Sequence, residues 1–442
     1  MHPNISTPIL SYMKQLESQG LTNIEELCDH LYEHYLRQVN QGLYSNGRYT
    51  QAGSNVTAKV QSALTTSSPK ALLEKNQEQE SQECILWCVN HYLGLNRNQN
   101  VIDKVCASVQ KYGTGSGTSA LSGGMSTLHK QVEIKLQQLV GKESVLLFPT
   151  GFTTNLGCLS ALPGKKDLII FDRECHASII DGVKLSGKKW VTFKHNNLRD
   201  LEQKVSKYKG EYQNIFVVVE SAYSMSGDLA PLQGIVDLKQ KYKFLVYVDE
   251  AHTFGIYGKN GAGYCSHLGI VEEIDFIAAT LSKATASIGG FVALKSKYVP
   301  LLHWRATTYT FQACLTPGDA AAILASLEEM ENDPSLIESL HKNNQYMRRR
   351  LKSAGFDLGT SASPIIPIFI SDVEKLQAFN KELYSRGIFS VSIFYPVVKP
   401  HEGRIRFVVS AAHTIEQIDT TVNILQELGL KYGVIKQAMV AA

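Results

Sequence analysis

Short apolar runs, separated by longer and more polar stretches, repeat through the middle of the chain. They are rich in β-branched and aromatic residues and lie at 145–148, 167–171, 190–193, 215–219, 244–248, 275–280 and 289–294. Continuous apolar runs bounded by polar turns are typical of strands that are buried on both faces of a sheet. Because helical stretches lie between the runs, this region predicts a mostly parallel α/β sheet.

The N-terminal part of the chain follows a different pattern. Residues 8–43 carry apolar positions at helical spacing, which predicts two short amphipathic helices. Residues 44–80 are mainly Ser, Thr, Gln, Asn and Gly, and we expect them to form a linker or a loosely ordered arm.

The last part of the chain predicts a smaller α+β domain. The expected elements are a long helix at 318–356, strands near 365–370 and 404–410, and a final helix around 414–431. Thr414 is expected to cap that last helix, with Gln417 three residues on. These changes divide the chain into an N-terminal segment (1–80), a large domain (81–305) and a small C-terminal domain (306–442).

The composition is that of a globular protein of 442 residues, 44% of them hydrophobic. Its 44 basic and 41 acidic side chains form no basic stripe that would indicate a nucleic acid partner. The eight cysteines lack the spacing of a zinc site, so we expect no metal. The chain opens without a signal-like segment and contains no run of the ~18 apolar residues that span a bilayer, which predicts a cytoplasmic protein with reduced thiols.

Polar residues stand directly after three neighbouring apolar runs. Glu220 ends one run, Asp249 follows the next, and Thr280 leads into Ser282 and Lys283. In an open parallel sheet, ligands bind outside the carboxyl ends of the strands. We therefore expect these groups to converge on one edge of the sheet.

Lys283 is surrounded in the sequence by small residues, in TLSKATASIGG, and we expect them to leave room for a bulky group. A desolvated lysine can lose its proton and attack a carbonyl to form a Schiff base. Taken alone, Lys283 would be interpreted as a surface lysine. Asp249 favours the Schiff base, because a buried carboxylate needs a partner and the protonated ring nitrogen of pyridoxal phosphate supplies one. His252 could then hydrogen-bond the cofactor's phenolic oxygen.

A phosphate site is expected where one strand is followed at once by a helical stretch. The backbone amides of Gly151 and Phe152 would meet the phosphate at the helix start, and Thr280 and Ser282 would add hydroxyls. His176, which follows another strand, could stack on a planar ring or be a buried structural histidine.

Together these residues resemble one family, the α-oxoamine synthases, pyridoxal phosphate enzymes that join an amino acid to an acyl thioester with loss of carbon dioxide. The resemblance runs from about residue 86 to the C-terminus. The blocks that carry it are NHYLGL (90–95), GTGSG (113–117), GFTTN (151–155), HASIIDG (176–182), ESAYSMSGDLAPL (220–232), VDEAHTFGIYGKNGAG (248–263), TLSKA (280–284) and RIRFVVSAAHTIEQID (404–419). It implies a homodimer of the aspartate aminotransferase fold (fold-type I), with the active site shared between subunits.

The resemblance also implies roles for individual residues. Lys283 would hold the cofactor and later move the α-proton of the amino acid, and Asp249 would pair with the ring nitrogen. His252 and Ser224 would contact the phenolic oxygen, and His176 would stack on the ring. The residues implied at the phosphate are Gly151, Phe152 and Thr280.

Three departures from the family pattern bear on the substrates. Phe394 stands where serine palmitoyltransferases and 8-amino-7-oxononanoate synthases carry an arginine. Arg406 is therefore expected to bind the amino acid's carboxylate, with Asn90 as a second substrate contact. Ala120 replaces another family arginine, and Gln312 lies in the segment whose Ser/Thr pair reaches the neighbouring subunit's phosphate. These changes predict an unusual pair of substrates.

The resemblance implies condensation of a small amino acid (serine, glycine or alanine) with an acyl-coenzyme A or acyl-carrier thioester to give an α-aminoketone. Bacterial serine palmitoyltransferases are most similar, and an acyltransferase like 8-amino-7-oxononanoate or aminolevulinate synthase is the alternative. Two readings from other classes are an aminotransferase or lyase and a catalytically silent regulatory subunit. The presence of Lys283, Asp249 and His176 disfavours the silent subunit.

Overall fold

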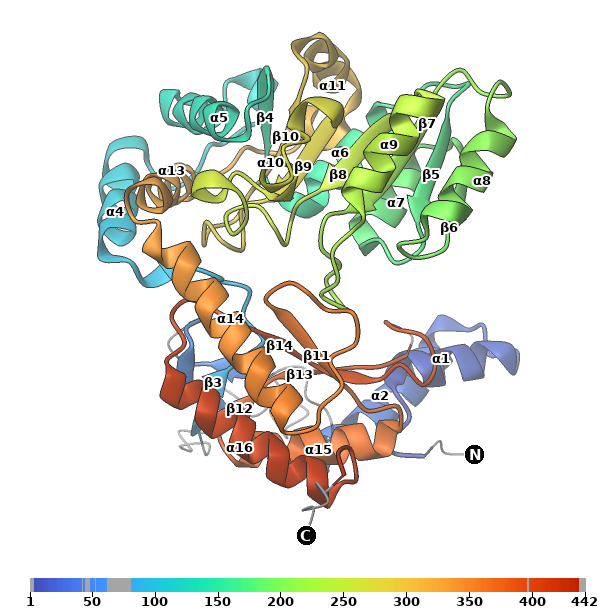
Figure 1. The fold of residues 1–442 in the computed structure, drawn as a ribbon, viewed down its shortest axis with the longest axis vertical. Helices are drawn as coiled ribbons and strands as arrows, with labels where there is room; N and C mark the ends of the chain where they lie inside the picture. Colours follow the sequence, from blue (N-terminus) through green and yellow to red (C-terminus); the bar gives the residue numbers. More distant parts are fainter. Residues whose placement is uncertain are drawn as a thin grey trace. The chain divides into compact units, whose positions relative to one another are not determined.

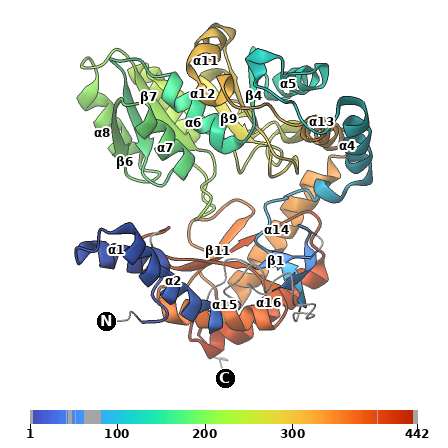
Figure 2. The same ribbon diagram turned by 180° about the vertical axis from the view of Figure 1, so that it is seen from behind.

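The computed structural model describes residues 4–41, 43, 48–51, 53–61, 81–395 and 397–436. The chain forms two compact units, drawn in Figure 1 and from behind in Figure 2. The units comprise Asn90–His341 with Ser410–Ala412 (the large unit), and Met1–Val89 with Lys342–Val409 and His413–Ala442 (the small unit). Each unit has its own sheet or sheets and its own buried side chains.

A seven-stranded sheet forms the centre of the large unit. In spatial order its strands are β4 (Ser144–Phe148), β10 (Gly290–Leu294), β9 (Phe276–Thr280), β8 (Leu245–Asp249), β7 (Ile215–Glu220), β5 (Leu168–Asp172) and β6 (Lys189–Phe193). β10 is antiparallel to both neighbours, whereas the strands from β9 to β6 are parallel to one another. Each apolar run that predicted a strand forms one, and the mostly parallel sheet is confirmed.

Helices cover both faces of this sheet. Figures 1 and 2 show α8 (Leu198–Tyr208) and α9 (Leu232–Tyr242) on one face, and α6 (Gly151–Ala161) and α7 (Ala177–Leu185) on the other. The other helices of the unit are α4 (Gln99–Tyr112), α5 (Thr127–Val140), α10 (Tyr264–His267), α11 (Val299–Arg305), α12 (Thr307–Thr310) and α13 (Pro317–Asn332). Its 3-10 helices are η1 (Leu95–Arg97), η2 (Ala120–Ser122), η3 (Lys259–Gly261), η4 (Val271–Glu273) and η5 (Ser296–Tyr298).

The carboxyl ends of β7, β8 and β9 lie side by side at one edge of the sheet. Glu220 is paired with Asp249 across β7 and β8, and Asp249 is paired with Ala278 across β8 and β9. Thr280, the last residue of β9, follows two positions later. This register brings together the polar residues that the sequence places after separate strands.

The small unit contains two sheets. One has the order β1 (Tyr49–Thr50), β2 (Thr57–Gln61), β3 (Ser81–Leu86), β12 (Ile388–Phe389), and the other the order β11 (Ile365–Phe369), β14 (Arg404–Val408), β13 (Val391–Ile393). Its helices are α1 (Ile9–Ser18), α2 (Ile24–Asn40), α15 (Val373–Ser385), α16 (Ile415–Lys431) and the end of α14 (Ser335–Ser353). Thr414 and Gln417 cap α16 reciprocally, as the sequence predicts.

The prediction of an irregular arm at 44–80 is wrong for the described part of that segment, which forms β1 and β2. Val60, in β2, is fully buried against Cys84 and Leu86 of β3. A strand that buries one face needs only alternate apolar residues, so a polar composition does not exclude it. Residues 62–80 lie outside the described residues.

The single helix expected at 318–356 is two helices, α13 and α14. The break falls at Asp333 and Pro334, because proline has no backbone N–H and disfavours helical conformation in the residue before it. Asp333 accordingly has φ −128° and ψ 83°. α13 packs against α4 and α5, which groups residues 306–341 with the large unit, whereas the sequence assigned them to the small domain.

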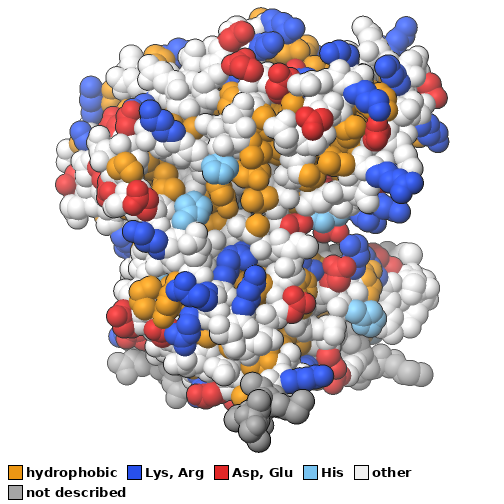
Figure 3. All heavy atoms as spheres, viewed as in Figure 1, with side chains coloured by type: hydrophobic (Ala, Val, Ile, Leu, Met, Phe, Trp, Pro, Cys, Tyr) orange, Lys and Arg blue, Asp and Glu red, His pale blue; other side chains and the backbone are white. Residues whose placement is uncertain are grey.

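The surface mixes charges of both signs, and the thiols are free. Acidic and basic side chains are interspersed on the face drawn in Figure 3. Across the described ranges, no helix is both long enough and apolar enough to cross a membrane. All eight cysteines are free, so no disulfide contributes to the stability of either unit.

Candidate active site

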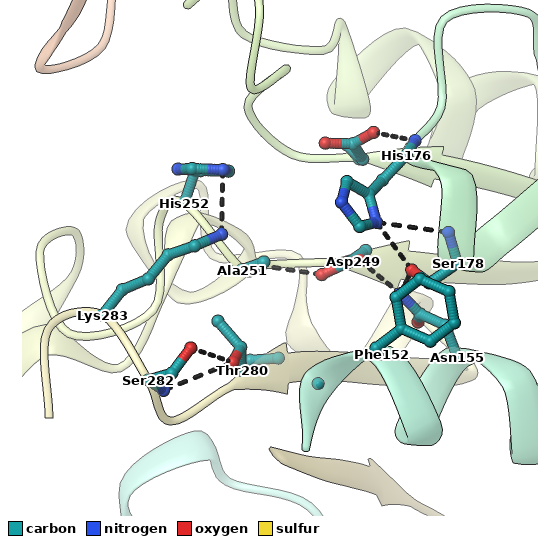
Figure 4. A pocket seen from close by; sticks show the side chains of 13 residues that line it. Phe152, Asn155, His176, Ser178, Asp249, Ala251, His252, Thr280, Ser282 and Lys283 are labelled. Atoms are coloured by element: carbon teal, nitrogen blue, oxygen red, sulfur yellow. Dashed lines mark hydrogen bonds between the residues drawn. The ribbon is translucent and has the colours of Figure 1, made fainter. Parts of the chain in front are cut away.

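A cleft of about 200 Å³ lies at the carboxyl ends of β7, β8 and β9, and Figure 4 shows it from close by. It is lined by Gly151, Phe152, Asn155, His176, Ser178, Glu220, Asp249, Ala251, His252, Ala279, Thr280, Ser282 and Lys283. Eight of the eleven predicted site residues are among them. Three predicted site residues do not line this cleft: Asn90, Ser224 and Arg406. Arg406 lies on β14 in the small unit.

Asp249 is a buried carboxylate whose orientation is fixed by hydrogen bonds. It ends β8 and is only 4% exposed. The backbone N–H of Ala251 donates to its Oδ1 atom over 2.8 Å, and the Asn155 amide donates to its Oδ2 atom over 2.6 Å. Tyr247 in turn donates to the Oδ1 atom of Asn155 over 2.7 Å. Asp249 is therefore held toward the cleft and cannot turn away from it (Figure 4).

Glu220 is a second buried carboxyl beside Asp249. Burial first, and then the nearby negative charge of Asp249, raise the pKa of Glu220 well above its usual value. Its Oε1 atom accepts a hydrogen bond from the backbone N–H of His176. Asp249 and Glu220 therefore place two carboxyl groups side by side along this cleft.

His176 presents a fixed, neutral ring to the cleft. Its side chain caps α7, because its Nδ1 atom accepts from the backbone N–H of Ser178 over 3.2 Å. Burial lowers the pKa of His176, and the negative charge of Asp249 only partly offsets this. The Phe152 ring meets it edge to face, with centroids 6.1 Å apart. A neutral aromatic ring in this position can cover a planar ligand.

The start of α6 and the end of β9 form a cradle for an anion. Gly151 opens α6, and a Cβ atom at this position would lie 2.5 Å from the Cβ atom of Thr280. Only glycine therefore allows the helix start to approach the strand so closely. The hydroxyls of Thr280 and Ser282 lie 2.8 Å apart at the same place. Free backbone N–H groups at a helix start, with added hydroxyls, suit a phosphate.

Lys283 is half-buried and its Nζ atom lies 2.8 Å from the Nε2 atom of His252 (Figure 4). The sequence predicts open space for a bulky group around Lys283; Lys283 does line the cleft, but its small neighbour Ala284 is closely packed. Ala284 is buried, and a Cβ atom on Gly255 would lie 2.3 Å from its Cβ atom. The small side chains instead allow the loop that carries His252 to pack tightly against the lysine turn.

Pyridoxal phosphate fits the groups that line this cleft. Asp249 offers a buried carboxylate to a protonated ring nitrogen, and the cradle at Gly151 and Thr280 offers N–H and hydroxyl donors to a phosphate. His176 offers a ring to stack on, and Lys283 offers an amine to an aldehyde. The ring nitrogen, the phosphate, the ring face and the aldehyde of the cofactor therefore each have a chemically suited partner among these groups.

Known proteins resemble this chain over most of its length. The model of the aminotransferase class I and II family matches residues 82–425. The chain belongs to this family. The serine palmitoyltransferase of Bacteroides thetaiotaomicron is 39% identical over 345 residues, which cover 78% of this chain and 87% of that protein. The 8-amino-7-oxononanoate synthase of Thermoanaerobacter pseudethanolicus is 34% identical over 382 residues, covering 86% and 95%.

Solved structures agree with the sequence relatives. A Sphingomonas wittichii serine palmitoyltransferase has a TM-score of 0.85 and 27% identity to this chain, and the match covers 94% of this chain and all of that one. A serine palmitoyltransferase structure described with its pyridoxal phosphate has the same TM-score at 28% identity. These matches confirm the fold-type I architecture and the resemblance to the α-oxoamine synthases that the sequence blocks indicate.

The sequence did not point to two residues that hold the site together. Asn155 orients Asp249. The hydroxyl oxygen of Tyr92 lies 2.7 Å from the Nδ1 atom of His252. Asn155 lies one helical turn after Gly151 in the same GFTTN block, so its spacing was a usable signal. Tyr92 belongs to the NHYLGL block, but nothing in the sequence indicates which way its side chain points.

A half-buried histidine bridges two carboxylates beside the turn that carries Ser224. The Nδ1 atom of His195 lies 3.0 Å from Asp172 and its Nε2 atom lies 2.7 Å from Asp228. Burial disfavours the charged imidazolium, but the hydrogen bonds to Asp172 and Asp228 outweigh burial and raise the pKa of His195 to about 10. The bridge ties the turn to the end of β5.

Replacing Gly151 with alanine is predicted to weaken cofactor binding. The new methyl group must push the start of α6 away from Thr280, which moves N–H donors away from the phosphate. We expect the affinity for pyridoxal phosphate to fall about tenfold, the effect of weakening one charge-assisted hydrogen bond. Titration of the apoenzyme with pyridoxal phosphate measures this affinity. Gly115→Ala is the matched control, since its Cβ atom would meet nothing within 4 Å. Equal affinities of the two variants would contradict the cradle.

Replacing His195 with glutamine is predicted to change how stability depends on pH. The folded-state pKa of about 10 lies above the usual histidine pKa of about 6.5, so the bridge stabilises the fold fully below about pH 6.5 and this stabilisation is lost as the pH rises toward 10. His195→Gln should cost ~3 kcal/mol at pH 7, and less at pH 10. Denaturant unfolding at both pH values measures this. His30→Gln, on the exposed side of α2, is the control. A loss that did not shrink with pH would contradict the charged bridge.

Proposed function

We propose that this protein uses pyridoxal phosphate to condense a small amino acid with an acyl thioester, giving an α-aminoketone, carbon dioxide and a free thiol. The observation that carries the proposal is the cleft in which Lys283, His252 and Asp249 meet beside an anion cradle. The relatives named serine palmitoyltransferase and 8-amino-7-oxononanoate synthase support the same reaction class. An aminolevulinate synthase-like specificity is an alternative within this class.

The side chains supply complementary parts of the chemistry. When bound, pyridoxal phosphate acts as an electron sink for the negative charge left on the amino acid's α-carbon. The Asp249 carboxylate keeps the ring nitrogen protonated, which strengthens that sink. The Lys283 amine, with His252 at 2.8 Å, accepts the α-proton, and His176 covers one face of the site. The α-carbon then bonds to the acyl carbon, and the C–S bond breaks so that the thiolate leaves and takes a proton from solvent. The carboxyl group leaves as carbon dioxide, and Lys283 returns the proton it accepted to the α-carbon.

The substrate side is where this chain departs from its family. We propose that Arg406 and Asn90 bind the amino acid, serine, glycine or alanine. Ala120 and Gln312 lie in neighbouring segments of the large unit, which are joined by a bridge between Ser119 and Ala313. Two departures so close together support an altered acyl or phosphate contact. The donor is a coenzyme A ester or a carrier-protein thioester.

Phe394, in the small unit, supports the proposal that Arg406 binds the amino acid's carboxylate. It lines a cavity of about 470 Å³ together with Tyr395 and Pro400. An aromatic side chain in this place cannot bind a carboxylate, which leaves that task to Arg406. Ser224 is proposed to contact the phenolic oxygen of the cofactor. We also propose a cytoplasmic homodimer whose subunits share the active sites, as the family resemblance implies.

The function is tested with Lys283→Ala. Without the amine, the visible absorbance of the Schiff base between Lys283 and the cofactor should be lost, and product formation should fall by on the order of a thousandfold. Lys295→Ala, an exposed lysine just after β10, is the control and should behave as the wild type. Substrates are glycine, serine and alanine, each with palmitoyl-coenzyme A. An unchanged spectrum in Lys283→Ala would contradict the assignment.

A further inference from the structure

We infer that Tyr92 is a positioning residue, which holds His252 so that its Nε2 atom faces Lys283 and thereby supports proton transfer at that lysine. The inference rests on the proposed function. The Tyr92 hydroxyl lies 2.7 Å from His252 Nδ1, and His252 Nε2 lies 2.8 Å from Lys283 Nζ. The three side chains form one continuous hydrogen-bonded chain within the large unit.

Tyr92 is held firmly enough to act in this way. It is 1% exposed, and its ring meets that of His252 edge-on at 79° with centroids 6.2 Å apart. Its backbone carbonyl accepts hydrogen bonds from Ala411 N, over 2.7 Å, and from Ser410 Oγ, over 3.2 Å. Gly94 allows the segment after it to come close to Ala412, because a Cβ atom there would lie 3.0 Å from the Ala412 Cβ atom. The phenol therefore approaches His252 from a fixed backbone.

A phenol suits this position because its hydroxyl can both accept and donate a hydrogen bond. When the proton of His252 is on Nδ1, that N–H donates to Tyr92 and Nε2 accepts from the Lys283 amine. The lysine lone pair is then unused by His252 and can take the α-proton. When the proton is on Nε2, Tyr92 donates to Nδ1, and the Nε2–H can serve an oxygen of the cofactor. Tyr92 satisfies the buried Nδ1 atom in both cases.

Loss of the contact between Tyr92 and His252 should affect the proton-transfer step specifically. Phenylalanine in place of Tyr92 keeps the ring but leaves the Nδ1 atom of His252, a 5% exposed residue, without this partner. The ring then loses the contact at Nδ1 that helps to point its Nε2 atom toward Lys283. Binding of the amino acid does not involve this contact, so we expect slower proton transfer with little change in affinity.

The test measures exchange of the amino acid's α-hydrogen with deuterium by NMR, with glycine, serine or alanine and no acyl donor. Tyr92→Phe should exchange about tenfold more slowly, the effect of one lost hydrogen bond in a buried chain, with an unchanged Kd for the amino acid. Tyr309→Phe is the matched control, since Tyr309 is also a buried tyrosine of the large unit. Its hydroxyl donates only a weak 3.9 Å bond, to Met125 Sδ.

A double-mutant cycle separates positioning from general damage. If Tyr92 acts through His252, Tyr92→Phe has no further effect in a His252→Gln background. In the apoenzyme, the ring nitrogen resonance that disappears in His252→Gln should shift in Tyr92→Phe. Additive losses, an unshifted resonance, or exchange as fast as in the wild type would overturn the role of Tyr92. A wild type that exchanges none of the three amino acids would contradict the proposed function instead.

Discussion

The burial of one carboxylate, Asp249, is the constraint on which the active site depends. An unpaired charge at the end of a buried strand costs several kcal/mol, so the surrounding structure must satisfy it. Asn155 and the N–H of Ala251 hold its oxygens, while burial and the charge of Asp249 raise the pKa of the neighbouring Glu220. What remains is a directed negative charge in a cleft, which is the group that a pyridinium nitrogen requires.

Close backbone packing determines where the other groups stand around that charge. Gly151 brings the start of α6 against Thr280, and Gly255 brings the loop of His252 against the turn of Lys283. Both contacts exclude a Cβ atom, so they hold the anion cradle and the lysine in place. The anion cradle and the lysine thus stand at the end of β9 and in the turn after it, and Asp249 ends the neighbouring strand β8.

Much of the large unit's fold and of its site was predictable from the sequence. Buried parallel strands have recognisable continuous apolar runs, and the polar residues that follow them must meet at one edge of the sheet. Lys283, Asp249 and His252 were found in this way. β2 was missed because it buries only alternate residues, and the break at Pro334 because helical periodicity continues on both sides of it. Tyr92 was missed for a different reason. Its contact with His252 joins residues 160 positions apart, and side-chain direction over such a distance depends on the folded chain.

In the proposed reaction, bond formation at the α-carbon is coupled to loss of the amino acid's carboxyl group. The most direct measurement follows serine, glycine or alanine labelled with ¹³C in the carboxyl carbon, incubated with enzyme, pyridoxal phosphate and palmitoyl-coenzyme A. Labelled carbon dioxide and free coenzyme A in equal amounts, with an unlabelled aminoketone, are the predicted result. Label retained in a keto acid, with the thioester unused, would make the protein an aminotransferase and contradict the account.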